Sequence, residues 1–110
     1  MRGPVFLALS FVVPALLAAQ APLGVAEHIA LGDSANAALA PQQALGHYRA
    51  ALAHDSTNYA ALWKAGREAV DIAKQIEGKD DSSKQVRDSL YVMARAYGEA
   101  AAREIGRAHV

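Results

Sequence analysis

The stretch ALGHYRAALAHDSTNYAALWKAG, residues 44–66, decides the fold. It is typical of the second half of one helix, a tight polar turn and the start of another helix. Before the turn, one helical face carries small and apolar residues: Ala44, Leu45, Tyr48, Ala51 and Leu52. After the turn, the corresponding face carries Leu62, Ala65, Gly66, Ala69 and Ala73. Because small residues dominate both faces, we expect the two helices to approach each other closely.

The composition bounds the chain to one small domain and favours helix. Its 110 residues include 11 Lys and Arg against 11 Asp and Glu, so the formal net charge is zero. Alanine is abundant, aromatic residues are few and only four prolines occur, which favours helix over sheet. The charge pattern forms no basic patch, so we expect no nucleic-acid partner. The absence of cysteine excludes disulfides and a thiol nucleophile.

Residues 1–19, MRGPVFLALSFVVPALLAA, have the layout of a secretory signal peptide: Arg2, an apolar run and then small residues. Cleavage after Ala19 or Ala21 fits the pattern, and Pro22 disfavours the second position. An uncleaved anchor is the alternative, although the run is shorter than the roughly 20 residues that a membrane span needs. We expect an exported protein, periplasmic or secreted, that meets the membrane only through this segment before cleavage.

Four helices are expected after a linker at residues 20–24. The apolar periodicity places them at about 25–39, 42–54, 58–76 and 83–103. The turn-forming sequence at residues 32–34, Gly-Asp-Ser, could divide the first of them. Pro41 suits the first turn of the second helix.

The sequence also predicts which residues cap the third and fourth helices and which face of the fourth helix is buried. Thr57 or Asn58 could cap the third helix, and Ser82 or Ser83 could cap the fourth. Gly78 suits the end of the third helix. The fourth helix is expected to bury one face: Val86, Leu90, Met93, Ala94, Tyr97 and Ala101.

The turn within residues 44–66 resembles the junction between two tetratricopeptide (TPR) repeats. In that family an Ala…Tyr..Ala-Leu helix runs through Asp-Pro-x-Asn into the next helix. Asp55 and Asn58 match this turn, and Ser56 stands where proline is usual. The resemblance covers residues 25–103.

Spacing within the chain agrees with this resemblance in its first part. Gly66 lies 34 residues after Gly32, which is the period of a TPR unit. Tyr97, however, lies 49 residues after Tyr48, so the second unit is stretched by 15 residues.

The resemblance implies an all-α fold, an α-solenoid of antiparallel helical hairpins. The signal-peptide helix expected from the layout of residues 1–19 would precede it. In TPR proteins the first helix of each unit lines a concave groove that holds partner peptides. Trp63, Arg67 and Asp71 follow one another at four-residue steps and would face this groove. A local Arg67–Asp71 ion pair and stacking of Trp63 on Arg67 are also expected. The alternative is that Trp63 packs under the preceding helix and the two charged residues are merely solvated.

Other candidate sites are weaker. The histidines 28, 47, 54 and 109 lack short metal-binding spacing, so we expect no metal and no cofactor. Ser34, His54 and Asp55 could be combined into a triad, but no nucleophile elbow or phosphate loop supports an enzyme. The acidic pair at residues 80–81 is expected to lie in a solvated loop, because it lacks calcium-loop spacing.

Residues 104–110, EIGRAHV, interrupt the apolar pattern at Gly106. They can be encoded by DNA that contains the start of a common short-read sequencing adapter. We therefore expect a non-native tail and a natural chain that continues beyond Arg103; a natural basic tail is the alternative. Since about three repeats are usually needed for stability, we also expect part of the fourth helix's apolar face to be exposed.

These features predict an exported, non-catalytic TPR-like scaffold that mediates protein–protein interaction. Its mechanism would be the burial of a partner segment on a rigid helical surface. The alternative function is the accessory helical region of an exported enzyme whose catalytic part is missing. A small four-helix bundle that binds a cofactor through histidine is a third possibility.

Overall fold

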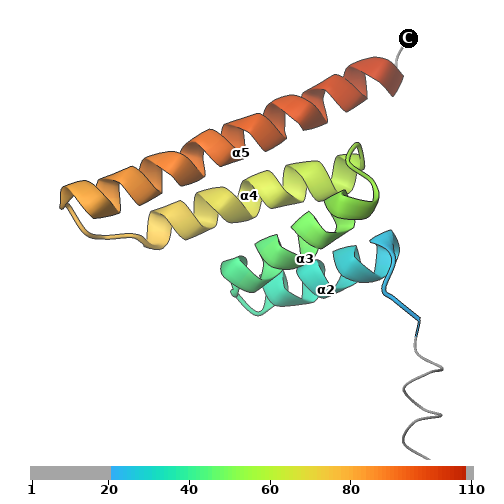
Figure 1. The fold of residues 1–110 in the computed structure, drawn as a ribbon, viewed down its shortest axis with the longest axis horizontal. Helices are drawn as coiled ribbons and strands as arrows, with labels where there is room; N and C mark the ends of the chain where they lie inside the picture. The colour runs from blue at the N-terminus through green and yellow to red at the C-terminus, as the bar shows by residue number, and fades with distance from the viewer. Residues whose placement is uncertain (1–20, 109–110) are drawn as a thin grey trace, which may run out of the picture.

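The computed structural model describes residues 21–108, and this part of the chain is all-helical, with no strand (Figure 1). The prediction of an all-α fold is therefore confirmed. The four helices are α2 (Val25–Ala37), α3 (Pro41–His54), α4 (Tyr59–Gln75) and α5 (Asp81–Ala108). The expected signal segment at residues 1–19 lies outside the described residues.

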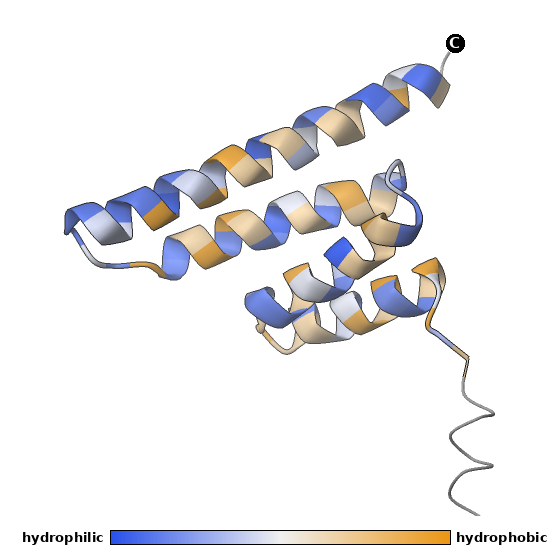
Figure 2. Cartoon of the chain, viewed as in Figure 1, coloured by the Kyte–Doolittle hydropathy of each residue, from blue (hydrophilic) through white to orange (hydrophobic). Residues whose placement is uncertain are grey.

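Consecutive helices run in opposite directions and pack on one another in chain order (Figure 1). Helix α2 packs on α3, α3 on α4 and α4 on α5, and α2 also touches α4. Each of the four helices carries both hydrophobic and hydrophilic residues (Figure 2). Among residues 21–108, no helix combines the length and the apolar character that a membrane crossing requires.

Two helices, α2 and α5, have boundaries that differ by two or more residues from the sequence prediction. Helix α2 is continuous through residues 32–34, because Gly32 lies within it as a packing residue and does not form a turn. The helix ends at Ala37, two residues before the expected end. Helix α5 begins at Asp81 and continues to Ala108, past the expected end at residue 103. Gly106 lies within this helix, and an ion pair between Glu104 and Arg107, one turn apart, supports its last turn.

Side-chain caps fix where α4 and α5 begin. Asn58 caps α4, and its Oδ1 accepts a hydrogen bond from the backbone N–H of Ala61 at 3.0 Å. The cap of α5 is Asp80 and not the expected Ser82 or Ser83. The Asp80 carboxylate accepts bonds from both the backbone N–H (3.0 Å) and the hydroxyl (2.8 Å) of Ser83. Asp80 directly precedes the helix, so its side chain reaches the N–H of the third helical residue, as an N-cap side chain does.

A side chain of α5 forms the hydrogen bonds that hold the loop between α4 and α5 in place. No glycine among the described residues has a positive φ, so Gly78 is not the left-handed cap that was expected. Instead, the Arg87 guanidinium donates to the carbonyl of Ile76 at 3.0 Å and to that of Gly78 at 2.8 Å. The first bond satisfies a carbonyl at the end of α4, and the second satisfies a carbonyl of the loop that follows.

The core lies where α2, α3 and α4 meet, and it is built largely from small residues. Ala44, Leu45, Tyr48 and Ala65 form its centre, and side chains from all four helices pack around it: Ile29, Ala35, Leu52, Ile72, Met93 and Tyr97. Two glycines permit close contact between helices. A Cβ on Gly32 would lie 2.4 Å from Cε1 of Tyr48, and one on Gly66 would lie 3.3 Å from the carbonyl oxygen of Ala94.

The apolar face of helix α5 is only partly buried, which agrees with the expectation that part of it is exposed. Of the six residues expected to be buried on it, only Ala101 is, whereas Val86 is 50% exposed. Helix α5 has 28 residues and α4 has 17, so their lengths are roughly 42 Å and 26 Å at the helical rise per residue. The longer helix therefore extends past its partner (Figure 1).

Candidate functional site

Trp63 lies on α4 with its ring partly open to solvent, at 39% exposure. The guanidinium carbon of Arg67 lies 5.0 Å from the ring centroid, so the expected Trp63–Arg67 stacking is present. Nζ of Lys64 lies 5.7 Å from the same ring. Both distances are within the range of a cation–π interaction. The indole is thus an exposed aromatic surface held in place by two cations.

Arg67 pairs with its neighbour Glu68 and not with Asp71 as the sequence suggested. Its Nε lies 2.8 Å from Oε2 of Glu68, whose side chain is only 1% exposed. Asp71 is half-buried and makes no ion pair among the described residues. A buried carboxylate has lost its water and needs a cation more than a partly solvated one does. The greater burial of Glu68 therefore explains why Arg67 pairs with Glu68 and not with Asp71.

A set of bonded polar side chains joins α2, α3 and α4, and we call it the polar seam: Asp33, Tyr48, Lys64, Arg67 and Glu68. Oδ1 of Asp33 accepts a hydrogen bond from the Tyr48 hydroxyl at 2.6 Å and one from Nζ of Lys64 at 2.9 Å. Nη2 of Arg67 donates to the same hydroxyl oxygen at 3.2 Å. The polar seam therefore fixes α4 relative to α2 through a buried tyrosine of α3.

The bonds of the polar seam shift the pKa values of its members. The hydrogen bond from Tyr48 holds the pKa of Asp33 below its usual range, and Lys64 adds to this effect. Burial, together with the bond to Asp33, raises the pKa of Tyr48 far above that of a free tyrosine. Burial acts to lower the pKa of Arg67, but Glu68 outweighs it and raises that pKa. Each shift favours the state in which the seam is fully bonded.

A cavity of about 300 Å³ lies beside the polar seam, between the α2–α3 turn and α4. It is lined by residues from α2, α3, α4 and the turn between α2 and α3: Asn36, Leu39, Pro41, Glu68, Asp71 and Gln75. Asp71, the third candidate from the sequence, therefore lies here and does not touch Trp63 directly. Oε1 of Glu68 is buried and has no hydrogen-bond partner in the described part of the chain.

The turn that forms one wall of this cavity has an unusual backbone. Leu39 adopts a φ of 59°, in the left-handed region that a branched residue rarely occupies, and it is 86% exposed. Its side chain stands at the cavity without packing in the core. Pro41, on the same wall, is buried at the first turn of α3.

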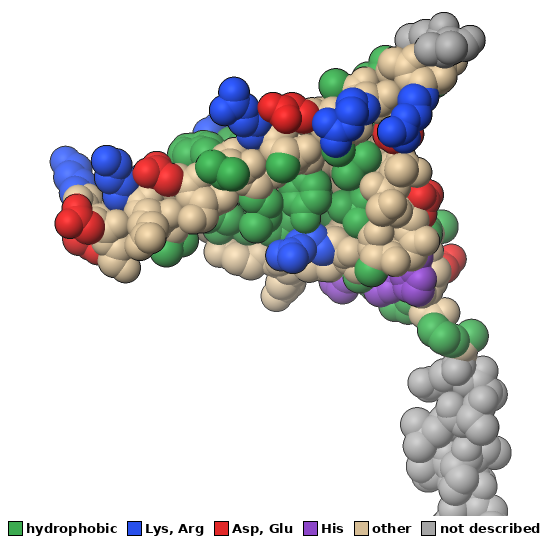
Figure 3. Space-filling model, turned by 45° about the horizontal axis from the view of Figure 1, so that its top comes forward, with side chains coloured by type: hydrophobic (Ala, Val, Ile, Leu, Met, Phe, Trp, Pro, Cys, Tyr) green, Lys and Arg blue, Asp and Glu red, His purple; other side chains and the backbone are tan. Residues whose placement is uncertain are grey.

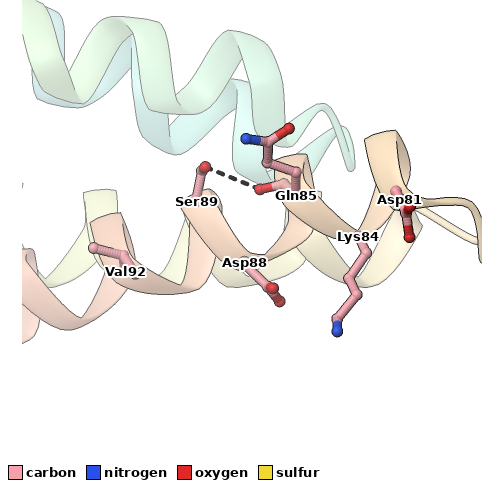
Figure 4. Close-up of a pocket in the computed structure, with 6 residues that line it drawn as sticks. All are labelled: Asp81, Lys84, Gln85, Asp88, Ser89 and Val92. Atoms are coloured by element: carbon pink, nitrogen blue, oxygen red, sulfur yellow. Dashed lines mark hydrogen bonds between the residues drawn. The ribbon is translucent and has the colours of Figure 1, made fainter.

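A larger cavity of about 450 Å³ runs along α5, but its chemistry is simple (Figure 4). All of its lining residues come from the first half of this one helix: Asp81, Lys84, Gln85, Asp88, Ser89 and Val92. Every one of them is exposed. The Ser89 hydroxyl bonds to the carbonyl of Gln85 on its own helix at 2.9 Å. Charges of both signs are spread along α5 (Figure 3). This surface is a solvated helix face with no buried polar group.

Three histidines come together although their spacing in the sequence gave no sign of it (Figure 3). The His28 ring on α2 lies 5.8 Å from that of His54 and 6.5 Å from that of His47, measured between centroids. His47 and His54 lie two turns apart on one face of α3. In residues 21–108, no group of three or more His, Asp or Glu side chains is placed to hold a metal ion.

The most informative polar residues of the site were missed by the sequence analysis. Tyr48 was expected in the core and its ring is buried there, but its hydroxyl also needs a partner, which Asp33 supplies. Glu68 lies three residues after Ala65, on the same helical face as this packing residue, and this position was the available signal for a buried carboxylate. Asp55 accepts bonds from Thr57 in its turn, so it serves as a turn residue.

Trp63, the polar seam and the cavity are linked through Arg67 and Glu68 into one surface of α4. Arg67 touches the indole ring and pairs with Glu68, and Glu68 lines the cavity. Comparison with protein families, with curated proteins and with solved structures finds no match to this chain.

Proposed function

We propose that this protein is a non-catalytic TPR-like scaffold that binds a peptide segment of a partner protein along α4, next to α2. The single observation that carries the proposal is the exposed Trp63 ring held between Lys64 and Arg67. Aromatic and arginine side chains of this kind contribute most of the binding energy at protein interfaces.

Rigidity of the surface supports the same proposal. Lys64 and Arg67 are tied through Asp33 and Tyr48 to α2 and α3, so the groups around the indole are ordered before a partner arrives. A preorganised surface loses less conformational entropy on binding than a mobile one. The order of helical hairpins and the 34-residue spacing of Gly32 and Gly66 are compatible with a TPR-like arrangement.

The test uses peptide selection and the fluorescence of Trp63, which is the single tryptophan of the chain. Peptides selected from a random display library on the immobilised protein should bind with a Kd in the micromolar range, about 1 to 100 μM. Binding should change the emission of Trp63, because the peptide excludes water from the indole. The emission therefore reports directly on the proposed surface.

The matched variants are Trp63→Ala and Tyr91→Ala, which each remove an exposed aromatic side chain of similar exposure (39% and 43%) from a helix. Trp63→Ala should weaken peptide binding at least about tenfold, whereas Tyr91→Ala on α5 should leave it unchanged. Helical circular dichroism should stay the same for both variants. Peptides that bind Trp63→Ala as tightly as the parent would refute the proposal.

Export through residues 1–19 is part of the proposal and rests on their sequence. The mature protein, recovered from the periplasm or medium of an expressing bacterium, should begin at Gln20 or Pro22. A chain that keeps Met1 and stays inside the cell would contradict this part alone.

A further inference from the structure

We infer that the cavity between the α2–α3 turn and α4 receives a cationic side chain, a guanidinium or an ammonium group, from the bound partner segment. This inference deepens the proposed function, since it names the chemistry of the residue that the partner must present. It rests on the charge, the bonding and the walls of the cavity.

The lining of the cavity is acidic. It contains the carboxylates of Glu68 and Asp71 and the amides of Asn36 and Gln75, and it contains no lysine or arginine. Arg67 balances the charge of Glu68 from outside the lining. The charge of Asp71 has no ion-pair partner among residues 21–108. A cation that enters the cavity would supply one, and an anion would be repelled.

Glu68 gives the cavity an acceptor that lacks a donor. Its Oε2 is bonded to Arg67, but its Oε1 is buried and unpartnered among the described residues. A buried carboxylate oxygen without a hydrogen bond is unfavourable, so almost all such atoms find a donor. Glu68 is one of the residues that line the cavity, so its under-bonded carboxylate adds negative charge there. Both cationic side chains carry several N–H donors and no acceptor.

The remaining walls suit the aliphatic part of such a side chain. Leu39 and Pro41 present apolar surface from the turn and from the start of α3. Lysine and arginine pack their methylene stems on apolar surface while the charged group meets polar atoms. A volume of about 300 Å³ is large enough for one side chain. The combination of apolar walls with two carboxylates is thus complementary to lysine or arginine.

The distance from Trp63 predicts where the cation lies in the partner. Trp63 and Asp71 are eight residues apart on α4, which is about 12 Å along the helix axis. An extended peptide advances about 3.3 Å per residue. A peptide residue that contacts the indole and the cationic residue in the cavity should therefore be separated by about three or four positions.

The first experiment probes the cavity without any peptide. Protein labelled with nitrogen-15 is titrated with N-acetyl-arginine methylamide, N-acetyl-lysine methylamide and the neutral isostere N-acetyl-citrulline methylamide. The two cations should shift the side-chain amide signals of Asn36 and Gln75 and the backbone amide of Asp71 in a saturable way. Citrulline should bind at least about tenfold more weakly because it carries no charge.

Two variants with the same charge change, one in the cavity and one on α5, show whether the probes bind in the cavity. Asp71→Asn should weaken both cationic probes at least about threefold, whereas Asp88→Asn, the same change on exposed α5, should have no effect. Glu68→Gln should weaken them as well, provided that circular dichroism shows it folded. Tyr91→Ala, which removes an exposed aromatic side chain from α5, should leave the probe titration unchanged. Equal binding of citrulline, an unaffected Asp71→Asn, or shifts confined to other parts of the chain would each overturn the inference.

Failure of the inference and failure of the proposed function are distinguishable. Selected peptides that depend on Trp63 but contain no lysine or arginine at the predicted spacing would overturn the inference and leave the proposed function in place. Saturable binding of the cationic probes, lost in Asp71→Asn, would support the inference even if no selected peptide depends on Trp63.

Discussion

The contact of Gly32 with Tyr48 offers the sharpest test of the packing that supports the site. In Gly32→Ala, the new Cβ would lie 2.4 Å from Cε1, 2.7 Å from Cδ1 and 2.8 Å from Cζ of the Tyr48 ring. The ring cannot easily move aside, because it is fully buried and its hydroxyl is bonded to Asp33 and Arg67. Helix α2 must therefore shift away from α3, or the tyrosine must leave its hydrogen bonds.

The expected change in the free energy of unfolding of Gly32→Ala is the sum of two losses and one gain. Inserting a methyl group into a packed contact costs about 1 to 3 kcal/mol, and disturbing the bonds of Tyr48 to charged partners adds about 1 kcal/mol more. Replacing glycine by alanine within a helix returns about 1 kcal/mol. We expect Gly32→Ala to lower the free energy of unfolding by about 2 kcal/mol, or Tm by roughly 10 °C for a domain of this size.

Gly46→Ala is the matched control, because Gly46 also lies within a helix but its Cβ would meet nothing within 4 Å. This variant should gain about 1 kcal/mol from helix propensity alone. Urea titrations followed by helical circular dichroism would give both free energies of unfolding. If the two variants were equally stable, the close contact of Gly32 with the Tyr48 ring would be refuted.

Four further predictions test the turn, the polar seam and the cap of α5. Leu39→Asn should raise the free energy of unfolding by about 1 kcal/mol, because asparagine tolerates the left-handed backbone at this exposed position. Leu39→Ala should give no such gain. Calorimetry of the two variants compares their stabilities. Tyr48→Phe should lower the free energy of unfolding by about 1 to 2 kcal/mol in urea titrations, since it removes hydrogen bonds to two charged groups. Because the pKa of Asp33 is lowered in the folded state, its contribution to stability is present above about pH 4 and is lost as the pH falls through the folded pKa. Asp33→Asn should remove that part of the acid sensitivity, and an unchanged pH profile would argue against the seam. Asp80→Ala should lower Tm and Asp80→Ser should restore most of the loss, since serine can also cap a helix; an unaffected Tm would show that the cap does not contribute.

The helices were predictable because their signals are local. The small-residue faces on either side of residue 55 place α3 and α4, and Pro41 and Asn58 begin these helices where sequence rules place them. The start of α5 was placed late because the sequence alone did not show that the carboxylate of Asp80 outcompetes the serine hydroxyls for the backbone N–H of Ser83. The end of α5 was placed early because an exposed glycine such as Gly106 weakens a helix without ending it.

The site was predicted only in part because its bonds join distant residues. Stacking of Trp63 on Arg67 is a contact between residues four apart on one helix, and helical geometry predicts it. The choice of Glu68 over Asp71 by Arg67 depends on burial, which is set by how α2 and α3 pack on α4. The bond between Asp33 and Tyr48 joins two helices, and the histidine group likewise unites α2 with α3. No local pattern encodes such contacts.

Arg67 connects the fold and the proposed site, and this determines which variants can separate them. Its guanidinium has contacts in three directions: the Trp63 ring, the Tyr48 hydroxyl and the buried Glu68 carboxylate. Lysine has neither a planar group to stack nor a fork of donors, so it could not make all three contacts at once. Reversing the charge at this position would bring a second carboxylate next to Glu68, with a cost to folding as well as to binding. Trp63 and Asp71 lie at the two ends of this arrangement and are not bonded within the seam. Changes at these two residues therefore test binding, and changes at Arg67 test the packing on which binding depends.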